Sequence, residues 1–102
     1  MPNPALTVTA PTGGSYSQAG NVPVTWTINP TQTSGEYGVW LYDGATWYFS
    51  QLLAAPATSA SVALSGIPQA SGYYAVVAWR PNVGTGAFVA WGTGSGSFTV
   101  IP

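Results

Sequence analysis

Few side chains in this 102-residue sequence can perform acid–base or nucleophilic chemistry. The charged residues are Glu36, Asp43 and Arg80, and the chain contains no histidine, cysteine or lysine. Serine–histidine triads, thiolate nucleophiles and Schiff-base lysines are therefore excluded. The two carboxylates flank one predicted strand, and they stand about 20–24 Å apart along it at ~3.3 Å per residue. Because the carboxylates of a glycosidase stand about 5–10 Å apart, we expect that this protein is not an enzyme.

The same inventory offers little to a metal ion or a cofactor. Zinc and copper sites are built mainly from histidine and cysteine, and calcium sites usually take several carboxylates. Asp43 with backbone carbonyls could form only a weak calcium site. Because Asp43 precedes Gly44, the simpler interpretation is that it forms a hairpin turn while Glu36 is solvated. We expect no metal and no cofactor.

The scarcity of charge also limits the possible partners. Charged residues make up 3% of the chain, against about 25% in typical globular proteins. One basic residue gives no footprint for nucleic acid and no patch for anionic lipid, and no apolar run approaches the ~18 residues of a spanning helix, so we expect no membrane insertion. Little like-charge repulsion keeps such molecules apart. We therefore expect self-association, or packing against neighbouring domains of a longer parent chain.

The elements that must position these side chains are β-strands, because alternating apolar segments are separated by turns and helical periodicity is nearly absent. Strands are predicted over residues 6–9, 22–28, 37–42, 46–51, 59–65, 73–80 and 95–100. Residues 81–94 are predicted to form a glycine-rich loop or ragged hairpin. Alternation places Trp26, Val39, Leu41, Val62 and Phe98 in the core. Seven strands with this pattern indicate an all-β, two-sheet antiparallel sandwich over residues 1–102 as a single domain.

The clearest strand signal covers residues 73–80. Successive side chains point to opposite faces of a sheet. One alternating set runs through Tyr74 and Val76, and the other through Tyr73, Val77 and Trp79. We assign the first set to the core, which turns the second set to the outer face.

Aromatic residues make up 14% of the chain, more than a core of this size holds. We expect strands 37–42, 46–51, 73–80 and 95–100 to share one sheet, with either Trp47 or Tyr48 facing outward. The candidate ligand-binding residues on its outer face are Trp40, Tyr42, Trp47, Tyr73, Trp79, Arg80 and Trp91. A cluster of exposed rings marks an interaction site, and flat indoles stack on the apolar faces of sugar rings. Arg80 either belongs to this face, is solvated or pairs with Glu36.

Other interpretations of the aromatic residues remain open. The rings could be covered by another domain, form a self-association surface in a filament, layer or dimer, or lie under the 81–94 loop as a satellite core. A register error of one residue in the strand over 37–42 or the strand over 46–51 would exchange the two faces of that strand. A structural spacer without a ligand is a further possibility.

Several segments resemble known families. Leu64, Ile67-Pro68, Gly72 and the pattern Tyr74-x-Val76-x-Ala78 resemble a corner and strand of fibronectin type III and related immunoglobulin-like domains. In those domains a tyrosine near the start of the strand bonds back to the preceding corner, and Tyr74 matches it. Four segments resemble the Ig-like N-terminal domain of a Ser/Thr-rich, GPI-anchored family related to fungal cell-wall β-glucan synthesis proteins: VTAPTGG (8–14), VTWT (24–27), VWLYDG (39–44) and SGSFTV (95–100).

This resemblance implies a seven-stranded antiparallel Ig-like or fibronectin-III-like β-sandwich in an extracellular, cell-surface setting, and it transfers no catalytic residue. Two functions follow as hypotheses. The first is a secreted module that binds polysaccharide or cell-wall glycan through its aromatic face. The alternative is a structural or self-assembling surface domain that takes no small ligand.

Overall fold

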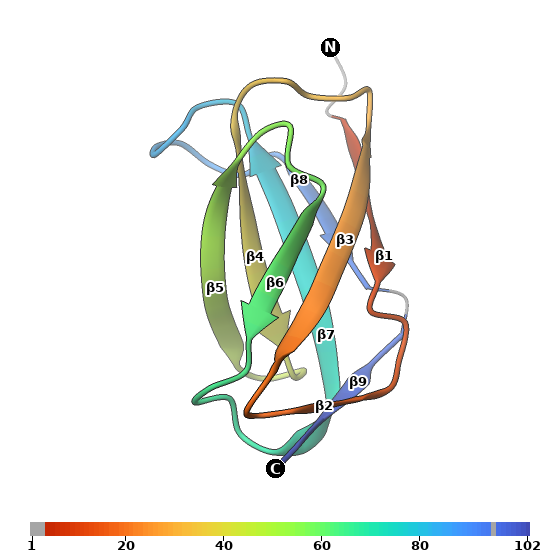
Figure 1. The fold of residues 1–102 in the computed structure, drawn as a ribbon. Helices are drawn as coiled ribbons and strands as arrows, with labels where there is room; N and C mark the ends of the chain where they lie inside the picture. Colours follow the sequence, from red (N-terminus) through yellow and green to blue (C-terminus); the bar gives the residue numbers. More distant parts are fainter. Residues whose placement is uncertain (1–3, 95) are drawn as a thin grey trace.

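A computed structural model of the chain describes residues 4–94 and 96–102, which form nine β-strands and no helix (Figure 1). The described part therefore has no helix that could cross a membrane. The prediction of an all-β fold is confirmed. The strands are β1 (Ala5–Ala10), β2 (Ser15–Ser17), β3 (Asn21–Asn29), β4 (Glu36–Tyr42), β5 (Trp47–Ala54), β6 (Ser59–Ala63), β7 (Ala70–Arg80), β8 (Ala90–Thr93) and β9 (Phe98–Ile101).

The strands form two sheets that enclose one core. The small sheet has the order β1-β3-β6, and the large sheet has the order β2-β9-β7-β4-β5, with β8 also paired to β7. The result is an elongated molecule of 43 × 24 × 22 Å. The loop between β7 and β8 lies at the end of the molecule opposite the C-terminus (Figure 1).

The structure has nine strands where seven were predicted, because two short strands occur in predicted turns and loops. After β1 the chain leaves the small sheet, passes Gly14 at a φ of 92°, and joins the large sheet as β2, parallel to β9. The second addition is β8, which lies in the segment 81–94 that was predicted as a loop or ragged hairpin, and its antiparallel pairing with β7 agrees with the hairpin. Strands β8 and β9 pair with successive parts of β7. Ser95, the predicted start of the last strand, lies outside the described residues.

The core follows the predicted alternation in every long strand except β7. Side chains from both sheets meet between them, and burying these apolar groups is the main contribution to stability. The largest fully buried residues include Trp26, Tyr37, Phe98, Leu41 and Leu64. Trp26 and Tyr37 bring the two sheets together with ring centroids 5.4 Å apart.

The predicted facing of β7 is wrong by one residue. Tyr73 is 0% exposed, Val77 is fully buried and Trp79 is 6% exposed, and all three belong to the core. Tyr74 is half-buried and lies on the opposite face. The hydroxyl that bonds back to the preceding corner is that of Tyr73, which donates to the carbonyl oxygen of Pro68 at 2.7 Å.

This bond gives a first test of the corrected facing. Tyr73→Phe should lower the free energy of unfolding by about 1–2 kcal/mol, because the Pro68 carbonyl loses its partner. The matched control Tyr74→Phe should change it by less than about 0.5 kcal/mol. Urea unfolding of both variants measures the difference. A larger loss for Tyr74→Phe would restore the original assignment.

Candidate functional site

On the face of the large sheet that points away from the core, six aromatic residues make ring–ring contacts. Trp40 and Tyr42 alternate along β4 with core residues, and Phe49 and Trp47 on β5 lie opposite them. Trp91 comes from β8 and Phe88 from the β7–β8 loop, and both rings pack close to Trp40. We call this set the aromatic platform: Trp40, Tyr42, Trp47, Phe49, Phe88 and Trp91.

Trp40 is the centre of the platform. Its ring centroid lies 5.6 Å from Phe49, 5.3 Å from Phe88 and 5.4 Å from Trp91. Phe88 also contacts Trp91, with centroids 5.8 Å apart. Beside this group, Tyr42 and Trp47 stack with their centroids 4.1 Å apart. Edge-to-face and offset pairs of this kind contribute roughly 0.5–1.5 kcal/mol each beyond the area they bury, so the rings hold one another in place.

A glycine gives the central ring its position. A Cβ atom built on Gly38 would lie 2.5 Å from Cη2 of Trp40 and 3.1 Å from Cζ of Phe88. The missing side chain therefore leaves the space into which the Trp40 indole folds, back along its own strand. Val76 and Ala78 on β7 face the same side of the sheet as Trp40, and both are almost fully buried. The platform is thus a second apolar layer over the outer face of the sheet.

The outermost rings of this layer remain open to solvent. Trp47 is 52% exposed, Phe49 57% and Trp91 53%. The part of the chain that the structure describes contains no pocket. The site is therefore a surface of exposed ring faces, suited to a ligand that lies across it.

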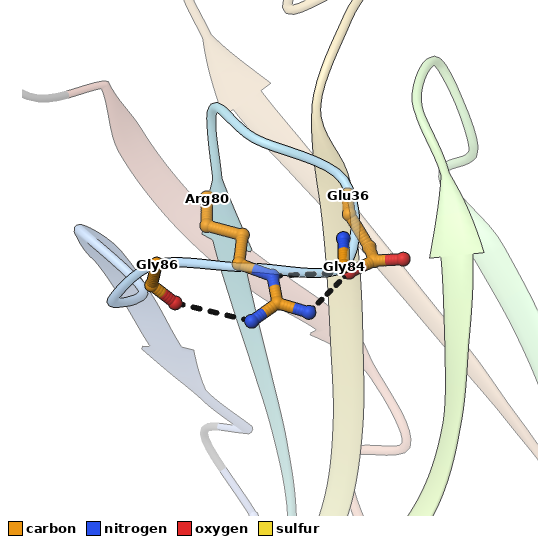
Figure 2. Close-up of polar contacts among 4 residues, drawn as sticks. All are labelled: Glu36, Arg80, Gly84 and Gly86. Carbon is orange, nitrogen blue, oxygen red and sulfur yellow. Dashed lines mark hydrogen bonds and ion pairs between the residues drawn. The ribbon is translucent and has the colours of Figure 1, made fainter.

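An ion pair stands at the end of the platform nearest the β7–β8 loop (Figure 2). Oε1 of Glu36 accepts hydrogen bonds from Nε of Arg80 at 3.0 Å, from its Nη2, and from the backbone N–H of Gly84 at 3.0 Å. Nη1 of Arg80 donates to the carbonyl of Gly86 at 3.1 Å. The guanidinium also lies 4.7 Å from the centroid of the Phe88 ring.

The expectation that Glu36 is solvated is wrong, since the residue is 7% exposed. Of the alternatives considered for Arg80, it pairs with Glu36 and also lies beside the platform. The two residues are directly opposite each other on β4 and β7. The hydrogen bonds from Arg80, followed by the one from the Gly84 amide, lower the pKa of Glu36 below its ordinary 4.5.

Asp43 lies at the other end of β4 and forms the predicted turn. Its Oδ1 accepts from the amides of Ala45 at 2.9 Å and Thr46 at 2.6 Å, and Gly44 follows at a φ of 96°. The Thr46 and Ala45 amides, in that order, lower the pKa of Asp43. The two carboxylates are thus engaged at opposite ends of one strand, and the described residues gather no group of potential metal ligands.

The structure brings together five of the seven predicted site residues. Trp40, Tyr42, Trp47 and Trp91 belong to the platform, and Arg80 borders it. Tyr73 and Trp79 do not, because both are in the core. The Trp79 indole N–H donates to the carbonyl of Ser34 at 3.1 Å, which gives it a structural role.

Sequence reasoning missed Phe49 and Phe88. Phe49 is two residues from Trp47 and shares its face, so strand alternation could have identified it. Phe88 lies in a loop and offers no periodic signal. No protein-family model matches the chain, and no curated protein matches it either. The function must therefore be inferred from the platform and the ion pair themselves.

Gly38 provides a test of the platform's packing. Gly38→Ala should force Trp40 and Phe88 apart and destabilise the protein by about 1–3 kcal/mol, as overpacking does. Gly20→Ala is the matched control, because a Cβ atom built on Gly20 would lie at an ordinary contact distance of 3.7 Å from its nearest neighbour, the Ser17 carbonyl oxygen. Thermal unfolding monitored by tryptophan fluorescence compares them. Equal stability of the two variants would contradict the packing described.

The pKa shifts predict how stability depends on pH. Because the pKa of Glu36 and of Asp43 is lower in the folded state, their stabilisation is complete above the ordinary values of 4.5 and 3.8 and is lost as the pH falls through the folded values. Burial raises the pKa of Tyr37 and Tyr73, so stability is also lost as the pH rises above 10.0. Urea unfolding should give a flat profile from about pH 5 to 9.

The Glu36→Gln variant should lose less stability at acid pH than the wild-type protein and the same amount of stability at alkaline pH. The Asp43→Asn variant separates the contribution of the turn from that of the ion pair. A decline that begins near pH 7 in the wild-type protein would contradict this account.

Proposed function

We propose that this chain is a non-catalytic extracellular module whose aromatic platform binds polysaccharide or cell-wall glycan. The observation that carries the proposal is the exposure of Trp47, Phe49 and Trp91 on a single face. Exposed apolar clusters of this kind usually mark interaction sites. No charged side chain lies among these rings, and Arg80 beside them is engaged by Glu36, which suits a neutral ligand.

We further propose that the fold is of the immunoglobulin or fibronectin type III kind. In support, one sheet has the order β1-β3-β6 and the other contains β9-β7-β4-β5 in sequence. These orders fit the A-B-E and G-F-C-C′ sheets of such sandwiches. The Tyr73 hydroxyl bonded to Pro68 fits their tyrosine corner. Domains of this kind are common on cell surfaces, which supports the extracellular setting.

The geometry favours an extended polysaccharide over a small sugar. Small ligands are usually enclosed in pockets, whereas the described residues form none. The exposed rings come from β5 and β8, on either side of Trp40. A chain of sugar rings could lie across them and cover several indoles at once. Exposed Thr93, on the same face as Val76, adds a hydroxyl at the margin.

Self-assembly is the second candidate, and the edge of the large sheet favours it. Strand β5 ends the strand order and carries Trp47, Phe49 and Leu52, all largely exposed. Charged residues and proline usually protect an edge strand from pairing with another chain. The β5 sequence WYFSQLLA contains neither. A second copy could therefore add to β5.

Binding to insoluble β-glucan, chitin and xylan tests the first candidate. We expect retention of the wild-type protein on at least one of them, and at least tenfold weaker retention of Trp91→Ala and Trp47→Ala. Ile101→Ala, an exposed apolar residue on β9, is the matched control and should bind normally. Failure on all three polysaccharides, with concentration-dependent oligomers in light scattering, would overturn glycan binding in favour of self-assembly.

A further inference from the structure

We propose that the Glu36–Arg80 ion pair is a latch that positions the β7–β8 loop, residues 81–89, on the aromatic platform, and that acid opens it. Glu36 and Arg80 are then positioning residues for the binding surface, since neither belongs to the exposed rings. The consequence for glycan binding rests on the function proposed above. The position of the loop does not depend on the proposed function, and it can be measured without a ligand.

Three contacts tie the loop to the ion pair. The amide of Gly84 donates to Oε1 of Glu36, the carbonyl of Gly86 accepts from Nη1 of Arg80, and the guanidinium lies against the ring of Phe88. Figure 2 shows the guanidinium between the Gly86 carbonyl and the Glu36 carboxylate. One side-chain pair, anchored on β4 and β7, therefore holds the loop at three successive points.

The third contact, between the guanidinium and Phe88, sets the shape of the platform. Phe88 meets Trp40 edge-on, at an interplanar angle of 85°, and also packs against Trp91. A released loop would withdraw Phe88 from both indoles. Trp40 and Trp91 would then be free to turn, and a ligand would have to order them on binding. Ordering a mobile side chain on binding costs conformational entropy, so opening the latch should weaken binding.

The latch depends on a single titrating group. Arg80 on β7 and the Gly84 amide of the loop face the Glu36 carboxylate, while its neighbour on β5 is Ala54. The only other acidic side chain, Asp43, is at the far end of β4, and Arg80 is the only basic one. Hydrogen bonds to an ionised acceptor are roughly twice as strong as neutral ones. Protonation of Glu36 therefore weakens the anchor, and the chain has no second charge that could replace it.

Amide hydrogen exchange of Gly84, followed by NMR, reads the latch directly. At pH 6 the Gly84 amide should be protected in the wild-type protein, and its protection should fall at least tenfold in Glu36→Gln. Gly94, directly after β8, is the internal control, because its amide donates to the carbonyl oxygen of Ala75 on β7 at 2.8 Å; its protection should not change. Unchanged Gly84 protection in Glu36→Gln would overturn the latch.

Arg80→Lys is the second variant, in case Glu36→Gln fails to fold. It keeps the positive charge, but a lysine cannot donate to Glu36 and Gly86 in the same fork geometry or stack flat on Phe88. Gly84 protection should fall in this variant too. Protection equal to that of the wild-type protein would contradict the proposed positioning.

Retention on the polysaccharide that the wild-type protein binds then tests the consequence. At pH 6, retention of Glu36→Gln should be at least threefold weaker than that of the wild-type protein. Wild-type retention should fall by a similar factor as the pH drops below 4.5. Retention of Glu36→Gln should stay constant over the same pH range. Normal binding by a variant whose Gly84 has lost protection would overturn the link between latch and site. If the wild-type protein binds no polysaccharide, the proposed function fails, and the latch is judged by Gly84 protection alone.

Discussion

The structure depends on the burial of β4 and β7 on both faces. Antiparallel sheets commonly pack one face on a core and expose the other, yet five consecutive residues of β7, 75–79, are buried. The small sheet covers one face. The aromatic platform covers the other, above Gly38, Val76 and Ala78. The first role of the platform is therefore to bury the outer face of β4 and β7. Its outer rings are exposed because nothing in the described chain lies over them.

The Glu36–Arg80 ion pair follows from the same constraint. A sheet with two apolar faces must still accommodate Glu36 and Arg80 at the ends of its central strands. Pairing them across β4 and β7, with Gly84 and Gly86 as further partners, gives Oε1 of Glu36 three hydrogen bonds and each guanidinium nitrogen of Arg80 one. The arrangement also brings the β7–β8 loop, and with it Phe88, over the sheet. Charge is scarce in this chain, and the pair that exists connects a loop to the rings.

Much of the fold could be predicted from the sequence, because alternation is clear wherever one face of a strand is polar. Trp26 in β3 and Phe98 in β9 are core residues as predicted. Strand β7 offered no such contrast, since both of its alternating sets are apolar. The charge of Arg80 was the available signal: it shares a face with Tyr74, not with Tyr73, and a charged residue at the end of a strand marks the outward set. Strand β2 was missed, and β8 was left open between a loop and a ragged hairpin, because each has only three or four residues. Phe88 was missed because a loop has no period.

In the proposed function, the exposed indoles of the platform contact a glycan. The most direct measurement is the NMR signal of the five indole N–H groups during titration with soluble β-glucan, chitin and xylan oligosaccharides. We expect one of these ligands to shift the signals of Trp47 and Trp91, with a smaller shift for Trp40, while the signals of the buried Trp26 and Trp79 do not move. Five unmoved signals with every oligosaccharide would contradict it.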